Sequence, residues 1–456
     1  MKFDTKTSLH GTPFKPVSTV VAGQVSDPGF DILGRACYDL TPPCEPAELT
    51  GDFLVAPPSI GRVHAQRDPL VAVIGVGYVG QHLVEVFSRN FDVIGYDISQ
   101  DRLDEVKRLF SGNARVQFTI SPVEIRRATH FLIAVPTLLL PDKRIDSSYL
   151  RSALHTVGSH AAAGSTIVIE SSVAVGMTRQ LLGPLAVERG FYAGMSPERV
   201  DPGRTTPSAH EIPKIISGLD DLVPSSLETI RKLYSQVFHH VVPVSAPEVA
   251  EMTKLYENCQ RMVCIAYVNE MADACVPHGI DPFEVCRAAS TKPFGYLPFV
   301  PGVGVGGHCI PVNPHYLLSN NDFPILRASS ARMSNRPSEM ANRIVAKLHD
   351  GIAPEFQPSV LVVGIGFKPG QSHLANSPGL ELAKCLVVTG KAHVVWADPL
   401  VAQSSIPQIA RLDDCEWSEA SLDSRFNFVA VVLRQDGLDY SVLERLQNAR
   451  VEMFCA

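Results

Sequence analysis

The chain of 456 residues has no hydrophobic run long enough to cross a bilayer. A membrane-spanning helix needs about 20 predominantly apolar residues, and the longest apolar stretch, residues 131–140, is interrupted by Pro136. The N-terminus also lacks the basic segment and apolar core that are typical of a secretory signal. These absences predict a cytoplasmic protein that does not contact a membrane.

An excess of positive charge and a cysteine framework are also missing. Lys and Arg number 40 against 47 Asp and Glu, which gives a formal net charge of −7, and no run of basic residues occurs. A nucleic-acid partner is therefore not expected, and a small molecule is the expected partner. The 10 cysteines show no spacing typical of disulfides or of a metal site, as expected for reduced thiols. We therefore expect no bound metal.

The length of the chain predicts two or three domains. Residues 1–66 are rich in Pro, Thr, Gly and Ser and predict an irregular extension. Apolar runs such as Leu70–Ile74 and Thr166–Glu170 then alternate with helical patterns over residues 67–245. This alternation is typical of a doubly wound domain with parallel strands that are buried on both faces.

A helical region follows over residues 246–345. It starts with a helical pattern from Pro247 to about Ala289, in which the first glycine is Gly279, and this length predicts a long helix. Alternating strand and helix patterns return over residues 346–456. The predicted fold class is therefore α/β, with two doubly wound Rossmann-like domains joined by a central helical domain with a long helix.

The first candidate site is a glycine-rich turn between a predicted strand and a predicted helix. Gly75, Gly77 and Gly80 have the spacing G-x-G-x-x-G, and Asp97 ends the following strand. Such glycines let backbone N–H groups approach a pyrophosphate, and the acid binds a ribose 2′-hydroxyl but repels a 2′-phosphate. We therefore expect NAD rather than NADP. The alternative is a glycine turn in an α/β domain that binds no nucleotide.

The second candidate site is a thiol in the glycine- and proline-rich segment Pro301–Pro314. Cys309 follows a part of this segment with almost no side-chain bulk, so a large ligand can approach the backbone there. This setting favours a thiolate nucleophile, whereas the alternative is a small buried hydrophobic residue.

The third candidate site lies on the predicted long helix. Lys254, Asn258 and Asn269 have a spacing that places them on one helix face. Near a reactive thiol, a lysine can stabilise an alkoxide or an oxyanion. The alternative is a solvated stripe with a surface lysine.

Together these features resemble the UDP-glucose/GDP-mannose dehydrogenase family of nucleotide-sugar dehydrogenases, over about residues 70–435. Seven motifs occur in the family's order: Gly75-Val76-Gly77-Tyr78-Val79-Gly80, Val135-Pro136-Thr137, Glu170-Ser171-Ser172-Val173, Ser196-Pro197-Glu198-Arg199-Val200-Asp201-Pro202-Gly203, Lys254-Leu255-Tyr256-Glu257-Asn258, Gly304-Val305-Gly306-Gly307-His308-Cys309-Ile310-Pro311 and Gly366-Phe367-Lys368-Pro369. The His-Cys-Ile-Pro and Ser-Pro-Glu-Arg forms are closer to the branch that acts on UDP-N-acetylhexosamines.

The resemblance implies a four-electron oxidation of the sugar C6 alcohol to a carboxylate with two NAD⁺, in a homodimer formed through the central domain. Cys309 would form a thiohemiacetal and then a thioester with C6, Lys254 and Asn258 would stabilise the C6 oxyanion, and Glu198 and Ser172 would position water. The implied cofactor residues are Gly75, Gly77, Tyr78, Val79, Gly80, Asp97, Arg102, Thr137 and Ser172. The implied substrate residues are Glu198, Lys254, Asn258, Gly302, Gly306 and Lys368.

The chain departs from the family's pattern at several positions. Asn313, which we keep among the candidate catalytic residues, stands four residues after Cys309 where the family usually has Asp, and an amide cannot accept a proton. His373 and Ala375 occupy the places of an Asp and an Arg, and Phe294 lies near the place of another Arg. Two alternatives therefore stay open: a protein that binds NAD and nucleotide sugars with little turnover, and a two-electron dehydrogenase of 3-hydroxyacid type.

Overall fold

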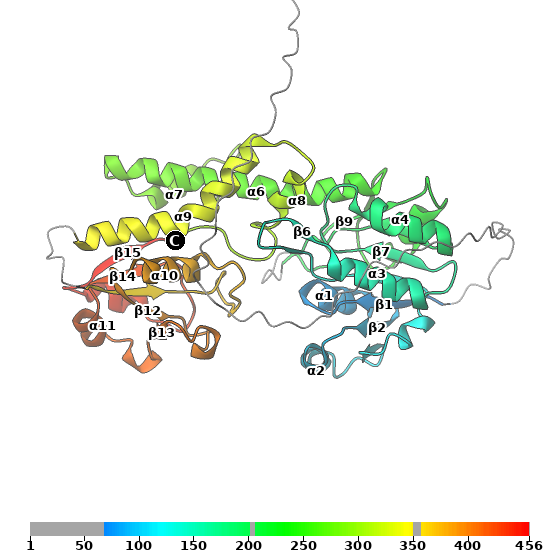
Figure 1. The fold of residues 1–456 in the computed structure, drawn as a ribbon, viewed down its shortest axis with the longest axis horizontal. Coiled ribbons are helices and arrows are strands. Elements are labelled where there is room, and N and C mark those ends of the chain that lie inside the picture. The colour runs from blue at the N-terminus through cyan, green and yellow to red at the C-terminus, as the bar shows by residue number, and fades with distance from the viewer. Residues whose placement is uncertain (1–67, 201–205, 350–356, 456) are drawn as a thin grey trace, which may run out of the picture. The chain divides into compact units, whose positions relative to one another are not determined.

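The computed structural model describes residues 68–200, 206–349 and 357–455, whose elements are labelled in Figure 1. All of these residues belong to one compact unit, residues 64–456. The irregular extension expected over residues 1–66 lies outside the described residues, and the predicted domain boundaries stay predictions. Within the described ranges, no helix is both long and apolar enough to cross a membrane.

The first α/β region is built on an eight-stranded sheet in the order β10-β9-β8-β7-β4-β1-β2-β3. Neighbouring strands are parallel except β8 and β9, which are antiparallel. The apolar runs at residues 70–74, 92–96, 131–135 and 166–170 predict strands, and they form β1, β2, β4 and β7 with ends that differ by at most two residues. The strands are β1 (Leu70–Ile74), β2 (Asp92–Tyr96), β3 (Val116–Thr119), β4 (His130–Ile133), β7 (Thr166–Ile169), β8 (Tyr192–Met195), β9 (Lys214–Gly218) and β10 (Val241–Pro243).

Helices cover both faces of this sheet. One apolar core contains Leu154 of α3 and Leu182 of α4, and the other contains Leu83 of α1 and Ile230 of α5. This is the doubly wound arrangement predicted from the sequence. The helices are α1 (Tyr78–Phe87), α2 (Gln100–Leu109), η1 (Glu124–Arg127), α3 (Ser148–His160), α4 (Met177–Arg189) and α5 (Ser226–Tyr234), and a short hairpin pairs β5 (Leu138–Leu139) with β6 (Ile145–Asp146).

The long helix of the central region is α6 (Pro247–Cys275), with 29 residues. It is shorter than the pattern up to Ala289 predicts, because the chain turns at Gly279, whose φ of +65° is favoured by glycine. Asp281 then caps α7 (Pro282–Ser290) by accepting a hydrogen bond from a backbone N–H. The remaining elements of this region are η2 (Val276–His278), α8 (Asn313–Leu318) and α9 (Pro324–His349).

The second α/β region contains a five-stranded sheet in the order β13-β12-β11-β14-β15, and all of its neighbouring strands are parallel. Its core includes Met340 and Ile344 of α9 and Leu382 of α10, so α9 is shared between the central helices and this sheet. The elements are β11 (Ser359–Val363), α10 (Pro378–Thr389), β12 (His393–Ala397), η3 (Gln403–Ser405), β13 (Ala410–Arg411), η4 (Asp414–Glu416), α11 (Glu419–Arg425), β14 (Phe428–Val431), η5 (Tyr440–Arg445) and β15 (Arg450–Met453).

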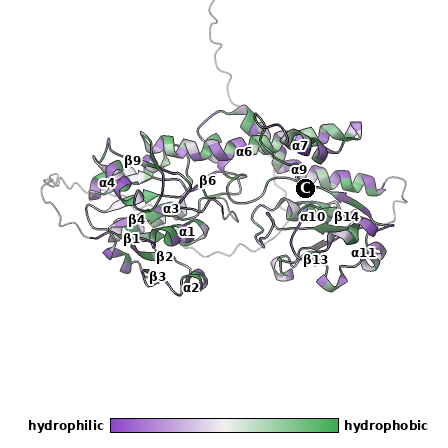
Figure 2. Ribbon diagram, turned by 180° about the vertical axis from the view of Figure 1, so that it is seen from behind, coloured by the Kyte–Doolittle hydropathy of each residue, from purple (hydrophilic) through white to green (hydrophobic). Residues whose placement is uncertain are grey.

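The distribution of hydropathy follows this architecture. In Figure 2 the helices carry both hydrophilic and hydrophobic residues, whereas the inner strands of the sheets are mostly hydrophobic. Val71, Val73 and Val362 are fully buried, as expected for strands that helices cover on both faces. The predicted fold class, two doubly wound Rossmann-like regions joined by a helical region with a long helix, is confirmed.

Candidate active site

The turn between β1 and α1 has the backbone geometry that the glycine spacing predicts. Gly75 has a φ of +87°, and a Cβ on Gly80 would lie 1.8 Å from the carbonyl oxygen of Gly75. A Cβ on Gly77, in contrast, would meet nothing within 4 Å. The first and third glycines therefore allow the tight turn, and the second leaves open space at the N-terminus of α1. A pyrophosphate fits such a position, since backbone N–H groups point toward it.

Asp97 and Arg102, two of the implied cofactor residues, both lie against this turn. Oδ2 of Asp97 accepts a hydrogen bond from the Val76 backbone N–H at 2.9 Å, and Oδ1 accepts one from Ser99 at 3.0 Å. Nε of Arg102 donates to the carbonyl of Val76 at 2.8 Å. Asp97 is only partly buried, so its remaining lone pairs are available to a ribose hydroxyl.

Three further cofactor candidates lie at the carboxyl ends of strands or beside them. The Thr137 hydroxyl donates to the carbonyl of Ser172 at 2.8 Å, which brings the segments after β4 and β7 together. Tyr78 begins α1 and is 42% exposed. Ligands of open parallel sheets bind at this edge, so the described residues suit a dinucleotide.

Cys309 is exposed, and its loop is fixed to its surroundings through its glycines. The backbone N–H of Gly302 donates to Oδ1 of Asn269 at 2.9 Å, and the carbonyl of Gly302 accepts from Nε of Arg336 at 2.8 Å. Gly307 has a φ of +90° and donates to the carbonyl of Ala375 at 2.9 Å. Because the thiol is exposed in an anchored loop, the interpretation of Cys309 as a buried hydrophobic residue is wrong.

Lys254 is buried rather than solvated, with 7% of the residue exposed. Burial lowers the pKa of Lys254, and the nearby Cys309 thiol and Glu198 carboxyl partly oppose this shift. Asn258 and Asn269, on the same face of α6, are also buried. The interpretation of this face as a solvated stripe is therefore wrong.

Asn313 is buried and touches the same face of α6. Its Oδ1 accepts a hydrogen bond from Nδ2 of Asn258 at 2.6 Å, and its backbone N–H donates to the carbonyl of Cys309 at 2.8 Å. The amide therefore keeps an acceptor for Asn258. It offers no group that can take a proton at this position.

Glu198 follows β8 and is held from two sides. Its Oε1 accepts hydrogen bonds from the backbone N–H groups of Arg199 at 2.6 Å and Val200 at 2.7 Å, and its Oε2 lies 3.3 Å from Nζ of Lys214. Burial acts to raise the pKa of Glu198, but the charge of Lys214 and the backbone N–H groups outweigh it. The pKa therefore lies below its ordinary value.

Lys214 and Tyr234 are site residues that the sequence reasoning missed. Nζ of Lys214 lies 2.6 Å from Oε2 of Glu170, and the Tyr234 hydroxyl donates to the other oxygen of Glu170. Complete burial raises the pKa of Glu170, while the charge of Lys214 opposes the shift. A lysine at the start of the apolar run Lys214–Gly218 was a signal in the sequence, because lysine is rarely buried without a partner.

The loop of Cys309 also contacts the segment that carries Lys368. A Cβ on Gly306 would lie 2.9 Å from Pro378 and 3.1 Å from Phe367, the residue before Lys368. Nε2 of His308 lies 3.0 Å from Nε2 of His373, one of the residues that depart from the family's pattern. Phe294 is 71% exposed. The structure thus brings Gly306 and the predicted substrate lysine to the same part of the molecule as the thiol.

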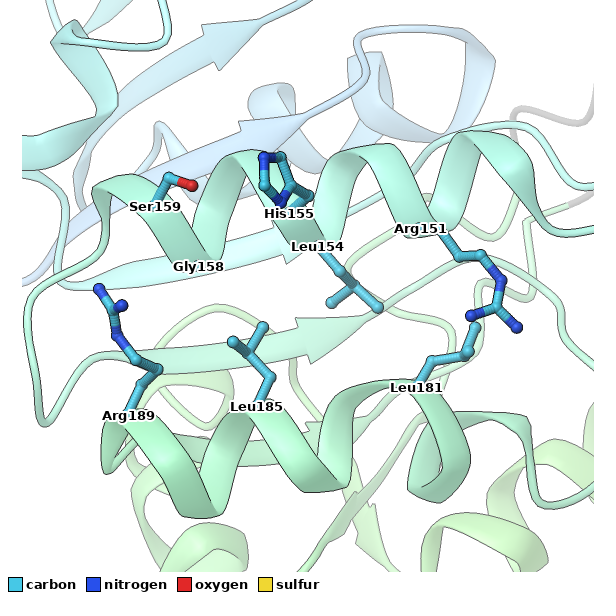
Figure 3. A pocket seen from close by; sticks show the side chains of 8 residues that line it. All are labelled: Arg151, Leu154, His155, Gly158, Ser159, Leu181, Leu185 and Arg189. Atoms are coloured by element: carbon cyan, nitrogen blue, oxygen red, sulfur yellow. The ribbon is translucent and has the colours of Figure 1, made fainter. Parts of the chain in front are cut away.

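A cavity of about 390 Å³ lies elsewhere, between α3 and α4. Figure 3 shows Arg151 and Arg189 at its two ends, with the side chains of Leu154, Leu181 and Leu185 between them. None of the predicted site residues lines this cavity, so it is separate from the candidate active site. In the described part of the chain, no group of three or more His, Cys, Asp or Glu side chains could hold a metal ion.

Comparison with protein families gives two matches. The NAD binding domain of the UDP-glucose/GDP-mannose dehydrogenase family matches residues 106–238, and the central domain of the same family matches residues 248–335. The first match begins at residue 106 and does not include the turn of Gly75 and Gly77. The evidence for nucleotide binding at this turn is its glycine geometry, described above.

Similar proteins include a UDP-N-acetyl-D-mannosamine dehydrogenase from Pyrococcus horikoshii, 30% identical over 69% of this chain and 80% of that protein. A UDP-N-acetyl-D-glucosamine 6-dehydrogenase from Pseudomonas aeruginosa is 34% identical over 70% of this chain and 80% of that protein. Both agree with the predicted branch of the family.

Solved structures show the same fold. The structure of the UDP-N-acetyl-D-mannosamine dehydrogenase from Pyrococcus horikoshii has a TM-score of 0.71 at 25% identity and covers 84% of this chain and 95% of that chain. A UDP-glucose dehydrogenase from Pyrobaculum islandicum has a TM-score of 0.72 at 22% identity over 87% of this chain and 96% of that chain, and at this identity it supports the fold alone. The sequence identities and the family matches together show that this chain belongs to the UDP-glucose/GDP-mannose dehydrogenase family and is an NAD-dependent nucleotide-sugar dehydrogenase.

Proposed function

We propose that this protein oxidises the C6 alcohol of a UDP-N-acetylhexosamine to the uronic acid through an intermediate bound to Cys309. The observation that carries the proposal is the contact of the Cys309 loop with the face of α6 that carries the buried Lys254: Asn313 donates its N–H to the carbonyl of Cys309 at 2.8 Å and accepts from Asn258, one turn after Lys254, at 2.6 Å. The names of the similar proteins support the substrate class, since both are dehydrogenases of UDP-N-acetylhexosamines.

The first oxidation converts the C6 hydroxyl to an aldehyde: the hydroxyl proton passes to a water molecule, and the hydride leaves C6. NAD⁺, when bound, supplies the acceptor for the hydride in both oxidation steps. The ammonium group of Lys254 and the second amide hydrogen of Asn258 donate to the C6 oxygen, which becomes negative when it loses its proton. Asn313 fixes the orientation of Asn258 through the hydrogen bond between their side chains.

The second oxidation uses Cys309. Its thiolate adds to the C6 aldehyde and forms a thiohemiacetal, and loss of the second hydride leaves a thioester on Sγ. Water then attacks the thioester carbon and releases the uronic acid together with the free thiol. The carboxylate of Glu198 accepts a hydrogen bond from this water, and the Ser172 hydroxyl helps to position it. Asn313 takes no part as a base, because an amide cannot accept a proton.

The proposal also assigns a function to each of the three regions of the chain. Residues 67–245 bind NAD, residues 246–345 carry Lys254 and Cys309, and residues 346–456 bind the nucleotide through Lys368. We also propose that α6 forms a homodimer. This is supported by Tyr256 and Tyr267, two α6 residues that are 66% and 73% exposed, since large exposed aromatic residues are enriched at interfaces between proteins.

The test is the stoichiometry of the reaction. Purified protein is given a limiting amount of UDP-N-acetylglucosamine, UDP-N-acetylmannosamine, UDP-glucose or GDP-mannose with excess NAD⁺, and NADH and uronic acid are both measured. We expect two NADH for each sugar consumed with a UDP-N-acetylhexosamine. One NADH with no acid would contradict the four-electron reaction and would favour a two-electron dehydrogenase.

A thiol variant provides the second part of the test. Cys309→Ser removes the nucleophile that forms the thioester, so uronic acid formation should fall by at least about 10³-fold. Its affinity for NAD, measured by calorimetry, should stay unchanged, because Cys309 is not among the residues that we expect to bind the cofactor.

The competing function is binding of NAD and a nucleotide sugar with little turnover. Asn313 favours it, because an amide stands where a base is expected. Tight calorimetric binding of NAD and of a UDP-sugar, with no NADH formed from any of the four sugars, would establish this function and exclude the proposed oxidation.

A further inference from the structure

Glu198 has a buried charged neighbourhood to which the proposed function gives no role. The side chain of Lys214 is 3% exposed and that of Glu170 is 0% exposed, and the two form an ion pair at 2.6 Å. The same ammonium group lies 3.3 Å from Oε2 of Glu198. The hydroxyl of Tyr234 donates to the second oxygen of Glu170. We call Glu170, Lys214 and Tyr234 the buried triad.

The topology of the sheet explains why the buried triad lies beside the site. In a parallel sheet the first residue of a strand lies at the edge opposite the ligand-binding edge. β9 is antiparallel to β8, with Met195 paired to Ser217, so its first residue, Lys214, lies at the carboxyl end of β8. Glu198 follows that end, and Glu170 follows β7, the next strand in the sheet. The reversed direction of β9, which β10 shares, therefore brings a cation to two carboxylates.

The two carboxylates of this cluster differ in how readily they keep their negative charge. Two buried carboxylates share one ammonium group, and two like charges at short range in a buried site cannot both be fully stabilised. Glu198 has the additional backbone donors of Arg199 and Val200, so it keeps its negative charge more readily than Glu170 does. The pKa values agree, since that of Glu198 is lowered and that of Glu170 is raised.

The groups that face Glu198 come from several elements. Lys214 approaches from β9, Glu170 from the end of β7 and Lys254 from α6. The guanidinium group of Arg199 is turned toward Glu257, at 2.6 Å, and does not compensate Glu198. Lys214 is therefore the cation in direct contact with the carboxylate.

We propose that Lys214, anchored by Glu170 and Tyr234, is a positioning residue that keeps Glu198 ionised and aimed at the thioester carbon. In the hydrolytic step a water oxygen bonds to that carbon, the C–S bond breaks with its electron pair returning to Sγ of Cys309, and the water proton passes to Glu198. Lys214 acts on this step through Glu198 and touches neither sugar nor cofactor. This inference rests on the proposed function and adds the residue that controls its last step, the hydrolysis of the thioester.

The main test compares Lys214→Met with Lys214→Arg, which keeps the positive charge. With saturating UDP-sugar and NAD⁺, the Met variant should still release two NADH in the first turnover, because both hydride steps precede hydrolysis. Its steady-state rate should then fall by roughly 100-fold, and intact-protein mass spectrometry after acid quenching should show the sugar acyl group on Cys309. Lys214→Arg should recover most of the rate.

A second variant separates a positioning role from a structural one. Glu170→Gln removes the carboxylate that competes for Lys214, so the acidic limb of the hydrolysis pH profile should move to lower pH. Lys214→Met should move the same limb to higher pH, because Glu198 loses its cation and faces Glu170. Opposite shifts are not expected from loss of packing alone, and Glu170→Gln also tests the proposal if the Met variant does not fold.

The outcomes distinguish the two proposals. If the wild-type enzyme forms no NADH from any UDP-sugar, both the proposed function and this inference fail. If the wild-type enzyme makes two NADH but Lys214→Met hydrolyses the thioester at the wild-type rate, only this inference fails. It fails equally if the Met variant loses its first-turnover NADH, or if Glu170→Gln and Lys214→Met shift the pH profile in the same direction.

Discussion

The two α/β regions each begin with the same arrangement of strand, glycine turn and acid. Gly75 and Gly364 have φ values of +87° and +81°, and each donates its N–H at 2.8 Å to the carbonyl at the end of the neighbouring strand. Asp97 accepts a hydrogen bond from the first turn at 2.9 Å, and Asp398 accepts one from Gly366 in the second turn at 3.0 Å.

The difference is what occupies the space outside each turn. Around Gly77 nothing lies within 4 Å of a Cβ position, whereas a Cβ on Gly366 would lie 2.7 Å from the carbonyl oxygen of Gln371. Asp398 is 1% exposed and is also contacted by Gln435. The second turn is therefore filled by its own chain. A Rossmann-like turn binds a dinucleotide only where the following segment leaves the turn open, and the second region supports the loop of Cys309 instead.

The largest expected effect comes from the last glycine of each turn. A Cβ on Gly80 would lie 1.8 Å from the carbonyl oxygen of Gly75, and a Cβ on Gly379 would lie 2.8 Å from that of Gly364. Gly80→Ala should therefore lower the free energy of unfolding by about 3 kcal/mol or more and abolish NAD binding, because the backbone has to move. Urea unfolding and calorimetry with NAD measure both quantities.

Gly379→Ala is the matched control for this comparison. Its smaller overlap should cost about 2 kcal/mol of stability, and the NAD affinity should stay within about twofold of the wild type, a change of less than 0.5 kcal/mol by the affinity relation. If Gly80→Ala kept wild-type stability and NAD affinity, or if Gly379→Ala lost NAD binding, the conclusion that the first turn binds NAD and the second does not would be wrong.

The next effect comes from the two acids. Asp97→Ala removes the carboxylate that we expect to bind the ribose hydroxyls, so the dissociation constant for NAD should rise about 10- to 100-fold, the range for a hydrogen bond to a charged group. Asp398→Ala leaves the buried N–H group of Gly366 and the more exposed N–H group of Leu400 without their acceptor. It should cost about 2 kcal/mol of stability without changing NAD affinity.

Cofactor choice gives the Asp97 prediction a second readout. Asp97→Asn keeps the shape but loses the charge that repels a 2′-phosphate, so the ratio of the dissociation constants for NADP and NAD should fall. If Asp398→Asn changed this ratio and Asp97→Asn did not, the proposed roles would be wrong: Asp97 would not bind the ribose, and Asp398 would not be purely structural.

The sequence predicted most of what the two turns share. Strong apolar runs such as Leu70–Ile74, glycine at fixed spacing and an acid at the next strand end are local signals, and they predicted β1, β2, β11 and β12. The face of α6 with Lys254 and Asn258 was predicted by helical periodicity alone. That this face lies near Cys309 was predicted from the family resemblance, because no local sequence pattern contains this information.

The sequence did not predict features that depend on contacts between distant segments. Nothing near Gly364 in the sequence shows that Gln371 and Gln435 close the second turn, because their contacts form only when the loop folds back. Lys214 was missed for the same reason, since its partners lie 44 and 16 residues away in the chain. The antiparallel β9 was not predicted either, because the direction of a strand in a sheet is set by its connections rather than by its composition.

The smallest expected effect on NAD affinity tests the open space itself, at the middle glycine of each turn. Gly77 has a φ of −61° and a ψ of −161°, at the edge of the extended region that alanine adopts, and a Cβ there would meet nothing within 4 Å, so Gly77→Ala should lower the free energy of unfolding by no more than about 1 kcal/mol. Its methyl group would occupy the space expected for the pyrophosphate, and the dissociation constant for NAD should rise about tenfold, or about 1.4 kcal/mol. Gly366→Ala should do the reverse, costing about 2 kcal/mol of stability, as in Gly379→Ala, through its contact with the Gln371 carbonyl oxygen, while leaving NAD affinity unchanged. Equal NAD affinity in Gly77→Ala and the wild type, measured by calorimetry, would mean that the pyrophosphate does not pass over Gly77.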